Sequence, residues 1–234
     1  MLQRIFHSVF FYLLTVVSFL VGTTITLFFV PFSRSSHKPF QIAGHIWARF
    51  LTFFSGVKVQ VSGLENIPRD KALILASNHQ GAADILILLA CLPINFRFAI
   101  KKELFKIPIF GWYLKKAGYF SIDRKLVLSA YRTVEAVIEI IKAGESVLIF
   151  PEGTRTKTGE LGRFKRGSLL AALKSRAPII PIAISGSFNI MKKGSWLFHP
   201  CPVKLSVGKP IEIKSEADYD NKIAEVRETI ARML

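Results

Sequence analysis

The chain has 234 residues, of which 50% are apolar, so it is long enough for one domain with a sizeable core and an additional segment. Lys and Arg outnumber Asp and Glu by 32 to 16, and the net charge of +16 indicates an anionic partner: nucleic acid, an anionic membrane surface or a phosphorylated substrate. A mean hydropathy of +0.37 and the lack of Asp and Glu before Glu65 favour the membrane over nucleic acid. Cys91 and Cys201 have no ligand spacing, which argues against a zinc site or a disulfide framework.

The N-terminal part of the chain is largely apolar. Residues 9–32 contain no charge, and a segment of this length can span a bilayer, which needs about 20 residues. Residues 40–54 follow, with many aromatic and aliphatic side chains around His45 and Arg49, a pattern typical of an amphipathic helix in a membrane interface. Together they predict a membrane-anchoring helical hairpin over residues 1–56, which either crosses the bilayer once or dips into one leaflet and returns. The alternative is that both helices pack as ordinary core.

From residue 57 onward, short apolar runs alternate with amphipathic segments, which predicts a second domain over residues 57–234. Strands that alternate with helices are typical of an α/β fold, and we expect one mixed or mostly parallel sheet with helices on both faces. The expected strands are residues 58–62, 72–77, 96–100, 120–122, 146–150, 179–184 and 203–207. The expected helices are residues 82–90, 101–106, 109–117, 126–142, 166–175 and 218–234.

A polar stretch, residues 77–84 (Ser-Asn-His-Gln-Gly-Ala-Ala-Asp), lies between a buried strand and the next helix, where α/β proteins usually place their chemistry. His79 and Asp84 would fall on different faces of one straight helix, so they meet only if His79 lies in the turn and Asp84 in the first helical turn. The carboxylate then accepts from one imidazole nitrogen and leaves the other free to take a proton, as in a general base with its orienting carboxylate. No Ser or Cys here serves as nucleophile, so the attacking group would be a hydroxyl of the substrate.

A second candidate element is residues 150–155 (Phe-Pro-Glu-Gly-Thr-Arg), which again follow a buried strand. Gly153 lets the backbone approach a ligand closely, and Arg155 is a forked cation suited to phosphate. Amides of this loop are also candidate donors to a developing oxyanion. The competing interpretation is a structural ion pair between Glu152 and Arg155.

A third element, residues 101–124, begins with Lys101 and ends with Arg124, and cations at both ends can converge on an anionic headgroup. Taken alone, this element is equally typical of a solvated basic face. The pair of His79 and Asp84 also has an ordinary explanation, because Asp favours a helix N-terminus and His79 would then be a simple turn residue.

These elements occur in a fixed order: Asn78-His79-x-x-x-x-Asp84, residues 101–124, residues 150–155 with 164–167 (Phe-Lys-Arg-Gly), and residues 180–184 (Ile-Pro-Ile-Ala-Ile). In this order and spacing they resemble the four motif blocks of the glycerolipid acyltransferase family, and within it the bacterial 1-acyl-sn-glycerol-3-phosphate acyltransferases, also called lysophosphatidic acid acyltransferases. One position departs from the pattern. Many members have Ser two residues after the histidine, where this chain has Gly81. That Ser is not the family nucleophile, so the departure concerns how the turn is held.

The resemblance implies transfer of an acyl chain from an acyl thioester, either acyl-CoA or acyl-acyl carrier protein, to the 2-hydroxyl of lysophosphatidic acid. The product would be phosphatidic acid, made for phospholipid synthesis. His79 would deprotonate the hydroxyl, and Asp84 would hold the imidazole tautomer and stabilise the imidazolium.

The resemblance also implies a site for the acceptor phosphate, formed by Lys101, Arg124 and Arg155, with Glu152, Gly153 and Thr154 shaping it. No metal or organic cofactor is required. The implied partners are membrane phospholipids and the two substrates, with no nucleic acid. The implied location is the inner (cytoplasmic) membrane, with the catalytic domain on its cytoplasmic face.

Three other functions are compatible with parts of the sequence. The first is the same chemistry with another acceptor, such as glycerol-3-phosphate or a different lysolipid. The second is a membrane-bound serine lipase, but the chain has no Gly-x-Ser-x-Gly elbow. The third is a basic membrane-binding or nucleic-acid-binding module without catalysis, although nothing resembles a nucleic-acid-binding motif.

Overall fold

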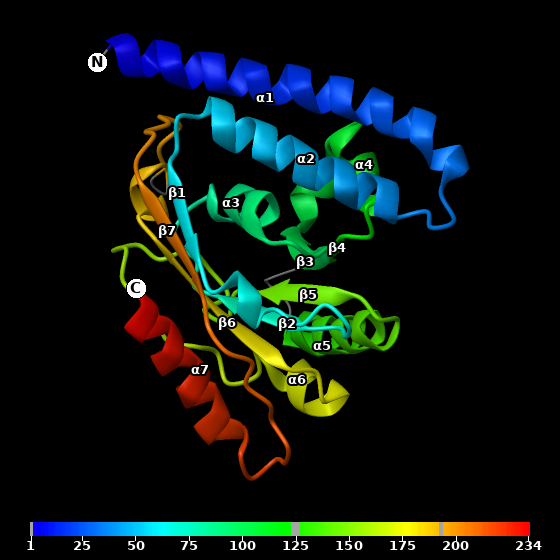
Figure 1. Cartoon of the computed structure of the whole chain (residues 1–234), viewed down its shortest axis with the longest axis vertical. Coiled ribbons are helices and arrows are strands. Elements are labelled where there is room, and N and C mark those ends of the chain that lie inside the picture. The colour runs from blue at the N-terminus through cyan, green and yellow to red at the C-terminus, as the bar shows by residue number, and fades with distance from the viewer. Residues whose placement is uncertain (1, 123–126, 192–193) are drawn as a thin grey trace.

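The computed structural model describes residues 2–122, 127–191 and 194–234. Over these residues, seven strands form one sheet in the order β1-β7-β6-β2-β5-β3-β4, and β6 with β7 is the antiparallel pair among otherwise parallel neighbours. Helices cover both faces of the sheet (Figure 1). The expected α/β fold with a mixed, mostly parallel sheet is therefore confirmed.

The strands are β1 (Val59–Ser62), β2 (Ile74–Ser77), β3 (Phe96–Lys101), β4 (Phe120–Ile122), β5 (Ser146–Ile149), β6 (Ile179–Ser185) and β7 (Val203–Val207). The α-helices are α1 (Leu2–Phe29), α2 (Lys38–Phe54), α3 (Asp84–Cys91), α4 (Phe110–Lys116), α5 (Val127–Lys142), α6 (Leu170–Ser175) and α7 (Tyr219–Met233). Short 3-10 helices are η1 (Val30–Phe32), η2 (Leu64–Asn66), η3 (Lys102–Lys106) and η4 (Ser187–Asn189). Gly118 and Gly144 end α4 and α5 in left-handed conformations, with φ of +77° and +80°.

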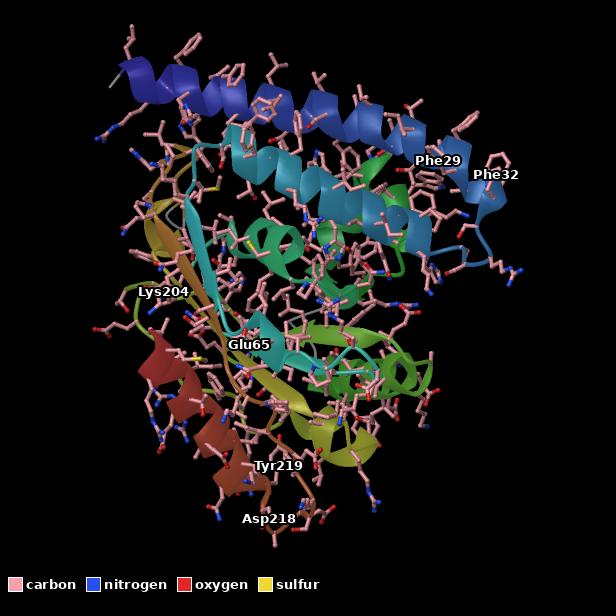
Figure 2. The ribbon with its side chains drawn as sticks, viewed as in Figure 1. Phe29, Phe32, Glu65, Lys204, Asp218 and Tyr219 are labelled. Carbon is pink, nitrogen blue, oxygen red and sulfur yellow. The ribbon has the colours of Figure 1, made fainter. Side chains whose placement is uncertain are left out.

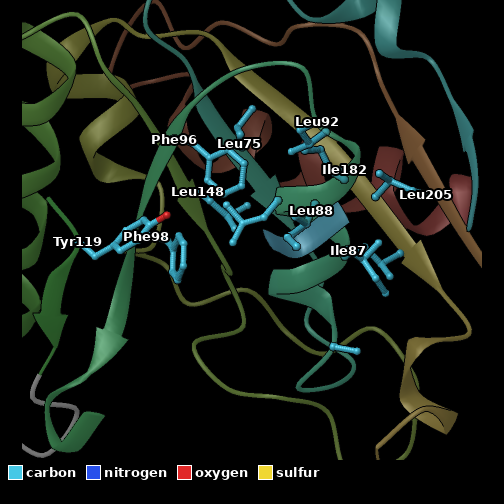
Figure 3. Close-up of a cluster of buried hydrophobic side chains, with 14 of the residues drawn as sticks. Leu75, Ile87, Leu88, Leu92, Phe96, Phe98, Tyr119, Leu148, Ile182 and Leu205 are labelled. Atoms are coloured by element: carbon cyan, nitrogen blue, oxygen red, sulfur yellow. The ribbon is translucent and has the colours of Figure 1, made fainter. Parts of the chain in front are cut away.

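Two hydrophobic cores lie on opposite faces of the sheet. One packs α1 to α4 against the sheet, and Figure 3 shows its centre, where Leu88 of α3 faces Leu75 of β2 and Leu148 of β5. The other packs α5, α6 and α7 against the opposite face. All four residues of β2 are buried, because this strand lies in the middle of the sheet and is covered on both sides.

Several helix predictions differ from the structure in type or in the residue at which the helix starts. Residues 102–106 form a 3-10 helix rather than an α-helix, and α3 begins at Asp84 rather than at residue 82. α6 begins at Leu170 rather than at residue 166, because residues 166–169 form turns in which the amide of Ser168 donates to the carbonyl of Lys165.

α1 lies across one end of the molecule, beside α2, and packs against the rest of the chain (Figure 1). Near its start, the Phe11 ring stacks on Phe198 with centroids 4.1 Å apart, and the Tyr12 hydroxyl donates to the carbonyl of Trp196 over 2.6 Å. Near its middle, the indole N–H of Trp47 on α2 donates to the Ser18 hydroxyl over 3.0 Å. α1 is thus attached to the rest of the chain at more than one point. The division of the chain at residue 56 stays a prediction.

The outer side of α1 is apolar and exposed. Arg4–Phe32 is a stretch long and apolar enough to cross a membrane, by length and composition, and only 11% of its most apolar window is buried. Phe29 and Phe32 project at the end of the helix and are 56% and 78% exposed (Figure 2). An apolar surface of this extent on a folded chain indicates an interaction site.

Candidate active site

The polar stretch between β2 and α3 lies at the carboxyl end of the sheet, in its centre. β2 has the parallel strands β5 and β6 as neighbours, so the loops that follow these three strands meet at one edge. Asn78, the first residue after β2, is 1% exposed and pairs with the backbone of Ile184 on β6. Its side-chain amide donates to the Ile184 carbonyl over 2.9 Å, and its side-chain oxygen accepts from the Ile184 amide over 2.8 Å. This double hydrogen bond fixes the start of the turn.

His79 and Asp84 meet as the spacing predicts. The Nδ1 atom of His79 lies 2.7 Å from Oδ2 of Asp84, and the aspartate is the first residue of α3 and is fully buried. The same Oδ2 accepts from the amides of Gln80, at 2.8 Å, and Gly81, at 2.9 Å, so the turn wraps around the carboxylate. This arrangement places the Nδ1 proton toward Asp84 and directs the imidazole through Nε2.

The other side of the imidazole is packed but remains accessible. The ring stacks on Phe150, the residue after β5, with centroids 3.9 Å apart and planes inclined by 15°. The His79 side chain is 13% exposed. In the described part of the chain, no group hydrogen-bonds to Nε2, and no serine hydroxyl or cysteine thiol hydrogen-bonds to the ring. Nε2 is therefore available to take a proton from a bound molecule.

Neither cysteine is suited to nucleophilic catalysis. Burial raises the pKa of the Cys91 thiol, at the end of α3, to about 11, against a weaker opposite effect of the Arg49 charge. Burial also raises the pKa of the Cys201 thiol. Both thiols thus stay protonated at neutral pH, whereas a nucleophilic cysteine needs a thiolate.

The loop after β5 is bonded to the turn that carries His79. The carboxylate of Glu152, which is 7% exposed, accepts from the amide of His79 over 2.8 Å and from the amide of Gly162 over 2.8 Å. The amide of Thr156 donates to the His79 carbonyl over 2.9 Å. Sequence reasoning placed Glu152 near the site but missed Gly162 and Thr156, because their contacts are made by backbone amides.

The candidate cations come from neighbouring strands. Lys101 ends β3 with its side chain 63% exposed and lies 3.6 Å from Glu103, and β3 is the parallel neighbour of β5. Arg155 is half-buried in the loop after β5, and no hydrogen bond or ion pair joins it to another described residue. Arg124 lies outside the described residues. Lys101 and Arg155 thus share the sheet edge with His79.

Two further predicted residues lie in the same loop. Gly153 has a left-handed φ of +72°, and an ideal Cβ built on it would lie 2.8 Å from Nζ of Lys165, so the ammonium group of Lys165 lies over this glycine. Thr154 is exposed. Lys165 is a cation beside the site that sequence reasoning did not single out, although it belongs to the motif at residues 164–167.

Gly81 is required by a close approach of another segment. An ideal Cβ at Gly81 would lie 2.7 Å from the carbonyl oxygen of Ser187 in η4, closer than real Cβ atoms come to a backbone oxygen. The Gly81 amide also donates to Asp84. The absence of a side chain at this position therefore allows η4 to pack against the turn that carries His79.

We expect Gly81→Ser to lower the free energy of unfolding by about 1–3 kcal/mol, because a side chain must push η4 and the turn apart. Thermal unfolding and turnover, measured together, check this: both should fall. Ala82→Ser is the matched control, since Ala82 is exposed and its change adds the same hydroxyl without the collision. If Gly81→Ser unfolded at the same temperature as the wild type, η4 would be able to move aside without loss of stability.

A buried carboxylate and an imidazole with one free nitrogen, at the carboxyl ends of the central strands of an α/β sheet, define a general-base site. The comparisons with known proteins agree with this class. A sequence model of the family described as Acyltransferase matches residues 58–185. A chloroplastic 1-acyl-sn-glycerol-3-phosphate acyltransferase from Arabidopsis thaliana is 35% identical over 217 residues, which are 90% of this chain and 59% of the relative.

Bacterial relatives match over more of their own length. The 1-acyl-sn-glycerol-3-phosphate acyltransferase of Pseudomonas aeruginosa is 31% identical over 230 residues, which are 95% of this chain and 86% of the relative. The crystal structure of the 1-acyl-sn-glycerophosphate acyltransferase PlsC from Thermotoga maritima superposes with a TM-score of 0.85 at 27% identity, covering 99% of this chain and 96% of that chain. The chain belongs to the 1-acyl-sn-glycerol-3-phosphate acyltransferase family.

Proposed function

We propose that this chain transfers an acyl group from an acyl thioester to the 2-hydroxyl of lysophosphatidic acid and so forms phosphatidic acid for phospholipid synthesis. The observation that carries the proposal is the hydrogen bond between His79 and buried Asp84, with Nε2 of His79 left accessible. The names of the family relatives supply the acceptor.

In this reaction, Nε2 of His79 takes the proton of the acceptor hydroxyl as its oxygen attacks the thioester carbonyl carbon. The C–O bond forms and the carbonyl becomes an oxyanion. Collapse of this intermediate breaks the C–S bond, and the departing thiolate takes the proton from the imidazolium, which returns His79 to its neutral form. Asp84 stabilises the imidazolium while it carries the positive charge. No step needs a metal or an organic cofactor.

The acceptor phosphate is proposed to bind the cations at the same sheet edge. Arg155 is half-buried and has no partner among the described residues, so its guanidinium is available for bidentate contact with phosphate. Lys101 adds a second positive charge from β3, and Arg124 is proposed for the same role. Gly153 and Thr154 form the backbone beside Arg155, where a side chain at position 153 would collide with Lys165.

The test is release of free thiol from palmitoyl-CoA by the purified protein in detergent, with and without lysophosphatidic acid. Acceptor-dependent release supports the proposal, and acceptor-independent release would reveal a thioesterase or lipase. Glycerol-3-phosphate and other lysolipids, used in the same assay, distinguish the alternative acceptors. If palmitoyl-CoA gives no release, palmitoyl-acyl carrier protein is tested as the second donor, and failure with both would contradict the proposal.

We expect Arg155→Ala to raise the apparent Michaelis constant for the acceptor and to leave the Michaelis constant for the thioester near its wild-type value.

We also propose that the chain lies at the inner (cytoplasmic) membrane, with α1 flat in the interface and the catalytic domain on the cytoplasmic face. α1 is held along its length by Trp196, Phe198 and Trp47, which leaves one apolar side facing outward. A helix attached in this way would have to separate from the domain before it crossed the bilayer. A flat orientation instead buries the outer side in lipid and keeps every contact.

We expect Leu13→Gln combined with Val17→Gln to weaken binding to phospholipid vesicles by roughly 10²-fold, because about 3 kcal/mol of apolar burial is lost. Both side chains are on the exposed side of α1, at 62% and 50% exposure, so thermal unfolding in detergent should not change. Co-sedimentation with vesicles measures the effect, and Lys142→Gln on distant α5 is the control. Undiminished sedimentation would mean that the basic surface is the main anchor.

A further inference from the structure

Glu152 is a buried carboxylate whose two oxygens are both engaged by the backbone. Oε1 accepts from the amide of His79 and Oε2 from the amide of Gly162, each over 2.8 Å. These amides belong to separate loops, the one after β2 and the one after β5. The carboxylate therefore bridges the two loops, and each of its oxygens accepts a backbone hydrogen bond. A carboxylate in this state is poorly placed to bind an anionic substrate as well, because it would repel the phosphate.

The bridge is one of several contacts that hold the backbone and the imidazole of His79. Its amide donates to Glu152, its carbonyl accepts from Thr156, and its Nδ1 faces Asp84. The Phe150 ring, two residues before Glu152, stacks on the imidazole. Every polar group of His79 except Nε2 is thus held, and the loop after β5 supplies most of the holding contacts.

Gly162 fits the bridge through its lack of a side chain. An ideal Cβ on Gly162 would lie 2.6 Å from Oε2 of Glu152 and 3.4 Å from its carboxyl carbon. The backbone of Gly162 does not have a left-handed φ, so its conformation alone does not require glycine. The requirement comes from the carboxylate, which occupies the space where a side chain would be.

The far end of the bridge is held by the C-terminal helix, which follows the region matched by the family model. Arg227 on α7 donates to the carbonyls of Gly162 and Leu161 over 3.3 and 3.5 Å. At the start of α7, the Tyr219 hydroxyl donates to the carbonyl of Arg166 over 2.5 Å (Figure 2). The loop after β5 is therefore anchored on α7. Because Glu152 of this loop bonds to the His79 amide, the anchored loop also holds His79 in place.

We infer that Glu152 is a positioning residue for His79, acting through the bridge to Gly162, and not a ligand of the acceptor substrate. The inference rests on the proposed acyl transfer and deepens it, because it assigns to one carboxylate of the site a role in placing the base. A base displaced by about 1 Å can lose 10²-fold in rate, so loss of the bridge should act on kcat.

The first test compares Glu152→Gln with Glu160→Gln, an exposed carboxylate of the same loop. A glutamine side chain at position 152 has one oxygen, which can accept from only one of the two amides, His79 or Gly162. Its NH₂ group then faces the N–H of the remaining amide, so that hydrogen bond is lost. We expect kcat to fall about 10- to 100-fold in Glu152→Gln, with the acceptor Michaelis constant within about twofold of wild type. Glu160→Gln should match the wild type in both. A large rise in the acceptor constant with kcat preserved would overturn the inference and make Glu152 a substrate ligand.

The second variant, Gly162→Ala, leaves Glu152 chemically intact and displaces its carboxylate. We expect the same fall in kcat, and we expect the double variant to be no slower than the slower single variant, because both changes break one bridge. Independent effects that multiply in the double variant would contradict the inference. Thermal unfolding of all variants separates loss of the fold from loss of position.

Hydrogen–deuterium exchange of the His79 amide gives a readout independent of turnover. Its protection should fall in Glu152→Gln and Gly162→Ala and stay unchanged in Glu160→Gln. If protection persists in the first two variants, the positioning role is wrong even where acyl transfer is established. If the wild type transfers no acyl group to any acceptor from either donor, the proposed function is wrong. Hydrogen–deuterium exchange of the His79 amide still tests whether Glu152 and Gly162 hold His79.

Discussion

Replacement of His79 by alanine is expected to lower kcat for acyl transfer by about 10²- to 10⁴-fold, because the group proposed to take the hydroxyl proton is removed. The fold should survive. The imidazole is one of three donors to Asp84, and the amides of Gln80 and Gly81 remain bonded to it. The loss of unfolding free energy should stay near 1–3 kcal/mol, and the rate of acceptor-dependent thiol release, beside thermal unfolding, measures both quantities.

His199→Ala is the matched control for this variant. The side chain of His199 makes no hydrogen bond within the described ranges, and the residue contributes only its amide to the carbonyl of Ile190. Its replacement should leave turnover unchanged. If His79→Ala kept a near-wild-type rate, the general-base mechanism would be wrong, whatever the rate of the control.

Asp84→Asn is expected to lower kcat by roughly 10³-fold or more, because it removes the charge that stabilises the imidazolium and orients its tautomer. The asparagine oxygen can take the place of Oδ2 and keep its three donors. Its amide nitrogen then occupies the position of Oδ1, which is buried and has no hydrogen-bond partner among the described residues. An unpaired buried amide costs about 1–3 kcal/mol, so the melting temperature should fall as well.

The two effects of Asp84→Asn can be separated. Turnover measured well below the new melting temperature reports the loss of charge, and the pH profile of kcat/KM should change shape because the imidazole has lost its carboxylate. Asp220→Asn on α7, an exposed carboxylate paired only with Arg166, is the control and should change neither quantity. A fall in rate of less than tenfold would mean that His79 acts without help from the charge of Asp84.

The fold class and the contact between His79 and Asp84 were predictable because both depend on local geometry. Alternating strands and helices are typical of a layered α/β fold, and the order of the strands in the sheet remained open. His79 and Asp84 are five residues apart, and a turn followed by a helix start is enough to bring them together at 2.7 Å. The helix starts were less accurate. The amides of Gln80 and Gly81 bind the Asp84 carboxylate, and α3 begins only at Asp84.

Sequence reasoning placed Glu152 near the site, but the hydrogen bonds that complete the site were not predictable, because they join distant parts of the chain. Glu152 is 73 residues from His79, and Ile184 is 106 residues from Asn78. These residues meet because β2 lies between β5 and β6, an order that the apolar pattern of each strand does not encode. The orientation of α1 is of the same kind. Its composition is compatible with a span across the bilayer, and its contacts with α2 and with residues 196–198 show that it packs on the rest of the chain.

The sequence by itself thus determined the α/β class, the His79–Asp84 pair and the apolar N-terminal helices, since periodicity and short spacing are properties of the local backbone. The tertiary structure alone decided that Glu152 bridges two loops, that Gly81 and Gly162 leave room for other segments, and that α1 rests on the domain. These features arise from close contact between segments far apart in the chain, and such contact is specified by strand order and packing rather than by any single stretch of residues.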